Sequence, residues 1–216
     1  MRSEVPSTET AARGHRWIHL LAIAVWLGTI VWGMGILLRF ASTPGDPGHP
    51  PLQWPEGSRI PAAHRPALLM AIHPRCPCTR ASIEELQQVM ARCRGQMEVH
   101  LIVVVPSAVS VSWLDTELER EATAIPGVNT YIDRGGIEAR RFGTATSGHT
   151  LVYNASGHLA FSGGITLARG HAGDNSGQDA VVEAIREGGP AHATHSVYGC
   201  PLHDPPPGAR ASESYR

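Results

Sequence analysis

The chain begins with one long apolar stretch and continues with short apolar runs that alternate with amphipathic segments. The stretch Trp17–Leu38 contains no Asp, Glu, Lys or Arg, and it is apolar all round rather than along one stripe. A helix needs about 20 such residues to cross a hydrocarbon core of about 30 Å. The pattern therefore predicts a transmembrane helix at 17–38, preceded by a cytoplasmic N-terminus at 1–16.

The flanking residues bear on orientation and on the alternative of a cleaved signal peptide. Arg13 and Arg16 precede the stretch, and only Arg39 follows it closely, so the positive-inside rule favours a cytoplasmic N-terminus. A signal peptide would have a shorter apolar core, of about 7–15 residues, followed by a small-residue cleavage site. Arg39-Phe40-Ala41 is a poor site of that kind. We therefore expect a membrane anchor, with the rest of the chain outside the cytoplasm, where disulfides persist.

The remainder of the chain predicts one α/β domain between two irregular segments. Residues 39–60 are rich in proline and glycine without a period of 2 or 3.6, which is typical of a linker. Apolar runs and helical spacings then alternate over a domain at 61–190, and residues 191–216 predict a flexible tail. Strands are expected at 67–72, 99–105, 128–133 and, as a hairpin, at 150–153 and 158–161; helices are expected at 79–94, 113–124, 136–142 and 178–186.

Charge removes one class of partner. The chain has 18 basic and 19 acidic residues, so its formal net charge is −1. A nucleic-acid-binding protein needs a strong positive field, and this composition does not provide one. We therefore expect no nucleic-acid partner.

The strongest chemical signal is the pair Cys76 and Cys78, which are separated by Pro77 and end an apolar run where a helix begins. A thiolate is favoured at a helix N-terminus beside cationic groups, and His73 and Arg75 are such neighbours. A disulfide between positions i and i+2 closes a small ring, so it would be strained and easily reduced. The motif favours a redox pair, although two unpaired cysteines, or cysteines that pair elsewhere, remain the alternative.

The order of elements around this motif resembles the thioredoxin-like superfamily. The segments His73–Ser82, Ser162–Thr166 and Tyr198–Leu202 together are similar to membrane-anchored bacterial RedB-like thiol oxidoreductases. The resemblance implies a thioredoxin-like three-layer α/β/α sandwich with a mixed sheet, anchored in the inner membrane with its soluble domain in the periplasm. It also implies disulfide exchange with protein thiols or disulfides. If the protein is a reductase, it needs electrons from a membrane donor, because no donor is encoded here.

We assign roles to the two thiols from their order at the turn. Cys76 comes first, so we expect it to be the more exposed and the attacking thiol, and Cys78, in the first helical turn, to resolve the mixed disulfide. Two departures from the family matter. Thioredoxins have two residues between their cysteines, and they place a cis-proline on the facing loop, where this chain has Gly148 and then His149. If a base assists Cys78, His149 or His73 is the candidate.

The same residues allow a metal site as the alternative function. Two thiols and an imidazole suit Cu(I) or Zn²⁺, so Cys76, Cys78 and His149 could bind copper as a carrier or chaperone does. Sco-type copper proteins resemble such an arrangement, but their cysteines are more widely spaced. Our first expectation is therefore a protein without a cofactor.

Two further features remain open. Cys200 on the predicted tail is a candidate third thiol, which could resolve or shuttle the disulfide. It could instead close a metal site with His203, be a surplus residue, or pair with Cys93. Cys93 is too far along the helix from Cys78 to pair with it. The loop Arg169–Gly177 has more polar and glycine content than a connection needs, and we expect helix capping and turn formation there rather than chemistry.

Overall fold

The computed structural model describes residues 8–62, 64–107, 109, 116–187 and 193–203. It consists of two units, Met1–Phe40 and Ala41–Arg216. The first unit is helical: α1 spans Thr8–Ser42, and its stretch Arg16–Ser42 is long and apolar enough to cross a membrane. A signal sequence near an N-terminus passes the same test. The predicted helix at 17–38 thus lies within one longer helix.

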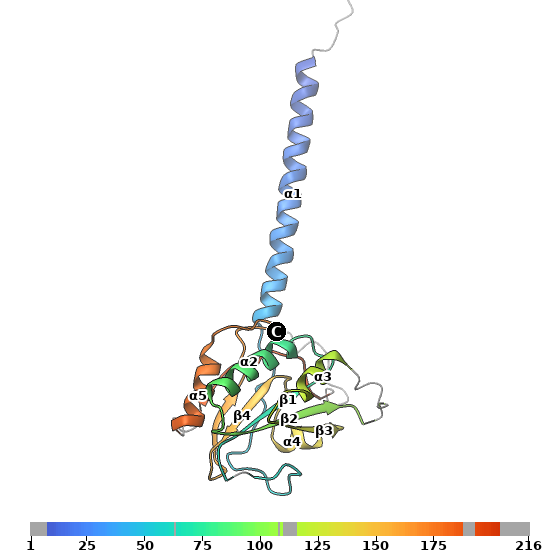
Figure 1. Cartoon of the computed structure of the whole chain (residues 1–216). Helices are drawn as coiled ribbons and strands as arrows, with labels where there is room; N and C mark the ends of the chain where they lie inside the picture. The colour runs from blue at the N-terminus through green and yellow to red at the C-terminus, as the bar shows by residue number, and fades with distance from the viewer. Residues whose placement is uncertain (1–7, 63, 108, 110–115, 188–192, 204–216) are drawn as a thin grey trace, which may run out of the picture. The chain divides into compact units, whose positions relative to one another are not determined.

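The second unit contains a mixed sheet with helices packed on it (Figure 1). Its strands lie in the order β3-β2-β1-β4-β5-β6. β1, β2 and β3 are parallel, β4 is antiparallel to β1, β5 is antiparallel to β4, and β6 is parallel to β5. The strands are β1 (Ala67–Ile72), β2 (Glu98–Val105), β3 (Val128–Arg134), β4 (His149–Tyr153), β5 (Leu159–Gly163) and β6 (Ala193–Thr194). The helices are α2 (Thr79–Arg92), α3 (Glu117–Thr123), α4 (Ile137–Arg141) and α5 (Ser176–Glu187).

This topology confirms the predicted fold class. The predicted apolar runs form central strands: β1 is buried along its whole length and β2 along nearly all of it. Asn154 Oδ1 accepts hydrogen bonds from the backbone N–H groups of Ser156 and His158, at 2.9 and 3.0 Å, and Gly157 adopts φ 76°. The hairpin predicted between β4 and β5 thus forms. The short strand β6 was not predicted.

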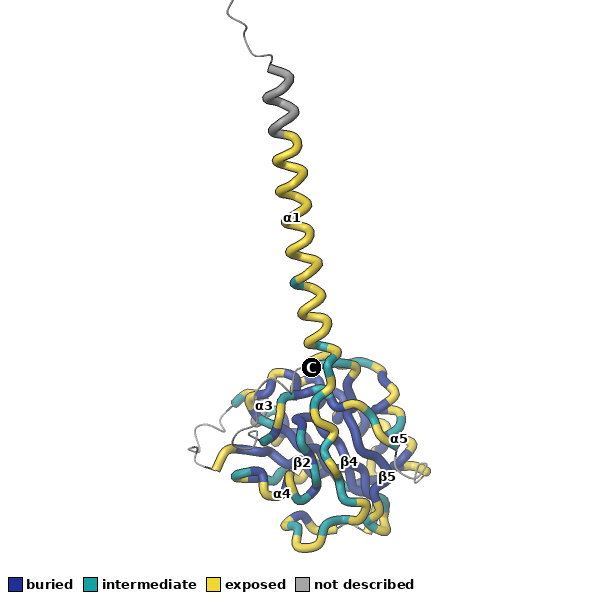
Figure 2. Tube along the Cα trace, turned by 180° about the vertical axis from the view of Figure 1, so that it is seen from behind, coloured by how far each residue is buried: buried dark blue, intermediate teal, exposed yellow. Residues whose placement is uncertain are grey.

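Two hydrophobic clusters lie on opposite faces of the sheet. On one face α2 and α5 pack their apolar stripes against alternate residues of β1 and β2, such as Met70 and Leu101. On the other face Leu69 and Ile102 belong to a second cluster, which α4 covers only in part. Extended chain covers the rest of this second face, and it runs over the strands as seen from behind in Figure 2.

The covering chain comes from the segment that we expected to be a linker, residues 39–60. The ring centroid of Trp54 lies 5.0 Å from that of Phe142 and 5.1 Å from that of Tyr153, and Ile60 is only 1% exposed. Tyr153 Oη donates a hydrogen bond of 3.0 Å to the carbonyl of Pro51. Prolines kept this segment out of helices and central strands, but its apolar side chains complete the core. Its second half is therefore part of the domain.

The burial of Ile60 predicts a difference in stability between two neighbouring positions. We expect Ile60→Ala to lower the free energy of unfolding by about 2–5 kcal/mol, because it empties space in the second cluster. The matched control is Leu52→Ala, which truncates a side chain that is 63% exposed, and it should change stability by less than about 0.5 kcal/mol. Urea unfolding of the full chain in detergent, followed by circular dichroism, measures both. Equal effects would mean that this segment does not belong to the core.

Candidate functional site

The Cys76–Cys78 motif lies in the turn between β1 and α2. The N–H of Cys76 donates to the carbonyl of His73 at 3.0 Å, and the N–H of Thr79 donates to the carbonyl of Cys76 at 3.1 Å. Cys78 is the N-cap residue of α2 and already has helical dihedrals, φ −70° and ψ −22°. Both thiols therefore lie where the unpaired N–H groups and the dipole of the helix favour negative charge.

The exposure of the two thiols differs from our expectation. Cys76 is 1% exposed and Cys78 is 8% exposed, so the prediction that Cys76 is the more exposed thiol is wrong. Cys76 nevertheless lines an open cleft of about 330 Å³, together with Pro74, Arg75, Pro77, Arg80 and Glu117. The cleft gives a substrate group a route toward the buried sulfur.

The third cysteine of the site comes from the end of the described chain. Residues 193–203, here called the C-terminal strap, are held along the domain: the N–H of Ser147 donates to the carbonyl of Cys200, and the N–H of Leu202 to that of Ala145, both at 2.8 Å. The Cys200 thiol is thereby placed in hydrogen-bonding contact with Cys76. This part of the segment that we expected to be a flexible tail is packed, because its backbone pairs with β5 and with the loop before β4.

These contacts set the ionisation of Cys76. A hydrogen bond from the Cys200 thiol is the largest effect, and it lowers the pKa of Cys76 from 9.0 to about 5 in spite of burial, which acts in the opposite direction. The backbone N–H of Cys200, the hydroxyl of Thr79 and the backbone N–H of Cys78 also donate to Cys76. Several donors that point at one sulfur stabilise its thiolate, so Cys76 is the ionised thiol at neutral pH.

The two neighbouring thiols shift the other way. The pKa of Cys200 is raised, first because its proton is held by Cys76 and then by burial. The pKa of Cys78 is raised first by burial and then by the negative charge of Cys76. Of the three thiols, Cys76 is therefore the one that carries the negative charge, and Cys78 and Cys200 stay protonated.

Ser147 connects the facing loop to the turn of the motif. Its Oγ accepts a hydrogen bond of 2.8 Å from the N–H of His73 and lies 2.8 Å from Thr79 Oγ1. When Thr79 donates to the Cys76 thiolate, Ser147 donates to Thr79. The N–H of Ser147 also donates a hydrogen bond to the carbonyl of Cys200. This buried residue therefore positions both Thr79 and Cys200, which contact Cys76.

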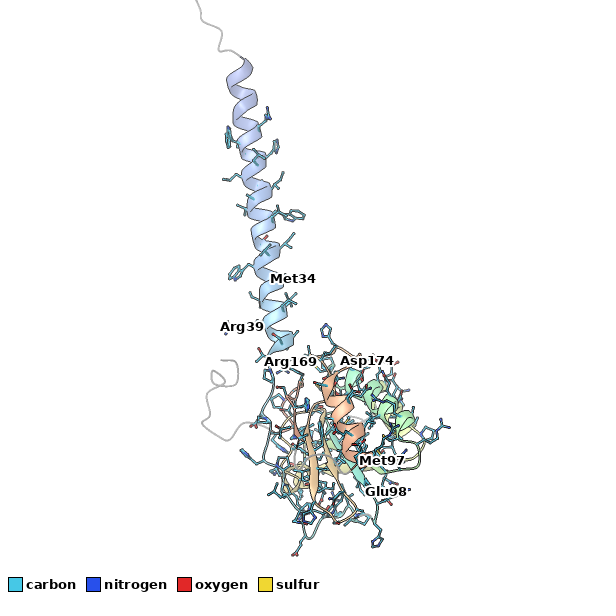
Figure 3. The ribbon with its side chains drawn as sticks, turned by 90° about the vertical axis from the view of Figure 1, so that its left-hand side faces the viewer. Met34, Arg39, Met97, Glu98, Arg169 and Asp174 are labelled. Carbon is cyan, nitrogen blue, oxygen red and sulfur yellow. The ribbon has the colours of Figure 1, made fainter. Side chains whose placement is uncertain are left out.

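Arg169 lies at the candidate site, and we did not single it out from the sequence. It lies at the opposite end of the domain from Met97 and Glu98, which are at the start of β2 (Figure 3). Its guanidinium donates to the carbonyl of Gly199 in the C-terminal strap and, at 3.2 Å, to that of Thr43. Its charge lowers the pKa values of Cys78 and Cys200, against the larger effects that raise them. The glycine-rich composition of its loop was the only signal in the sequence.

Gly148 occupies the facing loop, as the resemblance implied. It adopts φ 90°, and a Cβ atom there would lie 2.6 Å from Ser82 Oγ of α2. All peptide bonds of the described residues are trans. The loop therefore approaches α2 closely at this position, where only glycine fits.

His149 lies on the wrong face for the roles that we considered. It alternates along β4 with Leu151 and Tyr153 of the second cluster, so its side chain is on the face away from α2. Its Nε2 is 2.9 Å from Ser162 Oγ, and burial lowers the pKa of His149 to about 4, against the opposing charge of Asp46. His149 is therefore a neutral core histidine and is not the base for Cys78. His73, the other candidate base, accepts a hydrogen bond of 3.2 Å on Nδ1 from the N–H of Arg75.

The position of His149 on the far face of the sheet also removes the third ligand of the copper site that we considered. The structure does not bring His149 to Cys76 and Cys78, so these three residues do not form a metal site. Across the described ranges, no group of three or more His, Cys, Asp or Glu side chains could hold a metal ion. Cys93 lies buried at the opposite end of α2, so it is not the partner of Cys200.

Comparisons with known proteins found similar solved structures but no matching sequence family. No protein-family model and no curated protein matches the sequence. A hypothetical protein from Sinorhizobium meliloti matches with a TM-score of 0.53 at 20% identity, over 74% of this chain and 93% of that one. An uncharacterized conserved protein from Geobacillus kaustophilus matches with a TM-score of 0.54 at 15% identity, over 76% and 93%. A secreted Mycobacterium tuberculosis disulfide oxidoreductase homologous to E. coli DsbE matches with a TM-score of 0.43 at 17% identity, over 58% and 84%.

The topology and the place of the thiols define the class of protein. A β-α-β unit followed by an antiparallel hairpin and a last helix, with a cysteine pair at the N-terminus of the first helix of the domain, is a thioredoxin-like fold. The two structures with TM-scores above 0.5 support the fold alone.

The hydrogen bonds to Cys76 predict its titration. We expect a Cys76 thiolate to form with a midpoint near the pKa of about 5, measured as the ultraviolet absorbance of the thiolate that Cys76→Ser removes. Cys200→Ala should raise this midpoint, because it deletes the largest stabilising contact. Thr79→Val should raise it by less, since Thr79 contributes a smaller effect. The reverse order of the two variants would contradict the assignment of Cys200 as the main donor.

Proposed function

We infer that this protein is a membrane-tethered thiol-disulfide oxidoreductase that exchanges disulfides with protein thiols outside the cytoplasm. The observation that carries this proposal is Cys76, which lines a cleft and has several hydrogen-bond donors aimed at its sulfur. A thiolate is the nucleophile of disulfide exchange, and in this site Cys76 is the sulfur that carries the charge. The similarity of its motifs to RedB-like proteins supports the same activity.

The exchange begins at Cys76. Its thiolate attacks one sulfur of a substrate disulfide, so a mixed disulfide forms and the other substrate sulfur leaves as a thiolate. A second thiol of the protein then attacks the sulfur of Cys76, closes an internal disulfide and releases the first substrate sulfur. The reverse sequence oxidises a substrate dithiol, and a net reductase would draw its electrons from a membrane donor.

The position of this equilibrium follows from the hydrogen bonds to Cys76. They exist only while Cys76 is reduced and ionised, so they stabilise the dithiol form over the disulfide. A pKa of about 5 in place of 9.0 favours the reduced form at pH 7 by about 3 kcal/mol. This corresponds to a reduction potential higher by about 60 mV than that of the same couple without these bonds.

The test of the proposed function is a redox titration of the full chain in glutathione buffers, with thiol trapping. We expect an internal disulfide that includes Cys76, with a potential above the value of about −270 mV known for thioredoxin. Thr79→Val should lower the potential, because it removes a donor that acts only in the reduced state. A couple that never forms a disulfide, or one too stable to be reduced in any glutathione buffer, would contradict the proposal.

The membrane tether predicts a topology. In a bacterial host we expect the full-length chain to stay in the membrane fraction after an alkaline wash, because α1 offers an uninterrupted apolar span. Protease added to intact spheroplasts should digest the domain of residues 41–216. A shortened, soluble product would identify the stretch as a cleaved leader, and protection from protease would reverse the orientation.

A further inference from the structure

We propose that the internal disulfide of this protein joins Cys76 to Cys200 of the C-terminal strap, and that Cys78 stays a thiol throughout the exchange. The proposal rests on the proposed function and deepens it, since it names the resolving thiol. It replaces our expectation that Cys78 has this role.

The backbone of the motif disfavours a bond between Cys76 and Cys78. The hydrogen bond from the Thr79 N–H to the Cys76 carbonyl closes a turn, and Cys78 within it has helical dihedrals. In helical geometry side chains at i and i+2 do not face each other. A disulfide between them would therefore have to unwind the first turn of α2. The Cys78 thiol contacts both the Cys76 thiol and the guanidinium of Arg169, so it is the helical backbone, and not distance, that disfavours a bond between Cys76 and Cys78.

The C-terminal strap, by contrast, brings Cys200 to Cys76 without any change in α2. Both the thiol and the backbone N–H of Cys200 donate to the Cys76 sulfur. The preceding residue is held on two sides: Arg169 donates to the carbonyl of Gly199, and a Cβ atom on Gly199 would lie 2.0 Å from the carbonyl oxygen of Ser147. Cys200 is thus positioned before any substrate arrives, and it is also the most exposed of the three cysteines of the site.

The causes of the pKa shifts give the order of events. The largest cause that raises the pKa of Cys200 is its hydrogen bond to Cys76, and the charge of Cys76 acts in the same direction. Both disappear once Cys76 has become part of a neutral mixed disulfide, while the charge of Arg169 continues to favour a Cys200 thiolate. Burial raises the pKa of both thiols and remains. For Cys78 burial is the largest cause, and only the smaller effects of the Cys76 charge and hydrogen bond disappear. Attack by the substrate therefore activates Cys200 more than it activates Cys78.

The step balances without a further reactant. Cys200 loses its proton and attacks Cys76 Sγ, the bond between Cys76 and the substrate sulfur breaks, and the released substrate thiolate takes up a proton. The substrate disulfide has then gained two electrons and two protons. The protein has lost two electrons and the one proton of Cys200, because Cys76 started as a thiolate, and water supplies the second proton. A dithiol that attacks this bond restores the reduced protein.

Peptide mapping of the oxidised full chain distinguishes the two disulfides. The reduced protein in detergent is treated with glutathione disulfide, quenched in acid, alkylated and digested with trypsin. A Cys76–Cys78 bond remains inside the peptide 76–80, whereas a bond to Cys200 links that peptide to 187–210. We expect the linked pair in the wild type and in Cys78→Ser, and its loss in Cys200→Ser with accumulation of the glutathione adduct on Cys76.

Cys93→Ser is the matched control, because it removes a buried cysteine at the far end of α2 and should leave the linked pair unchanged. A bond within 76–80, a bond between Cys78 and Cys200, or a lasting glutathione adduct in the wild type would overturn the proposal and leave the proposed function standing. Cys76 that forms neither an adduct nor a disulfide would overturn both. The wild-type map separates a bond within 76–80 from a bond to Cys200 without relying on any variant, and a linked pair that persists in Cys78→Ser assigns that bond to Cys76.

Discussion

The hydrogen bond between the thiols of Cys200 and Cys76 is the contact on which the chemistry of this molecule depends. Burial alone would raise the pKa of Cys76 and leave an inert thiol. The bond from Cys200 reverses this, and the helix N-terminus and Thr79 add to it. Because Cys200 is far from Cys76 in sequence, the reactive state exists only in the folded domain with its C-terminal strap in place.

The C-terminal strap depends in turn on how the second face of the sheet is covered. A single short helix, α4, lies there, and extended chain from before β1 and after α5 packs beside it. Ile60 and Leu202 enter the same hydrophobic cluster from these two segments. The N–H of Gly45 also donates to the carbonyl of Val197 at 2.8 Å, so the two segments hold each other. Core packing on this face therefore delivers Cys200 to the thiol end of α2.

Much of the fold could be predicted because its signals are local. Continuous apolar runs predicted β1 and β2, helical spacing predicted α2 and α5, and the Asn154–Gly157 turn predicted the hairpin. The covering segment and β6 could not be predicted in this way. Proline-rich chain lacks a period even where it is buried, and β6 has only two residues, so both are defined by the surfaces that they meet.

The sequence by itself determined the thiol pair, its place at a strand-to-helix turn, the glycine of the facing loop and the apolar helix near the N-terminus. Each is a property of neighbouring residues. Only the tertiary structure decided which thiol carries the charge, that Arg169 and Ser147 support the site, and that His149 does not. Those outcomes depend on hydrogen bonds between segments distant in sequence, and on the side of the sheet to which β4 turns alternate residues.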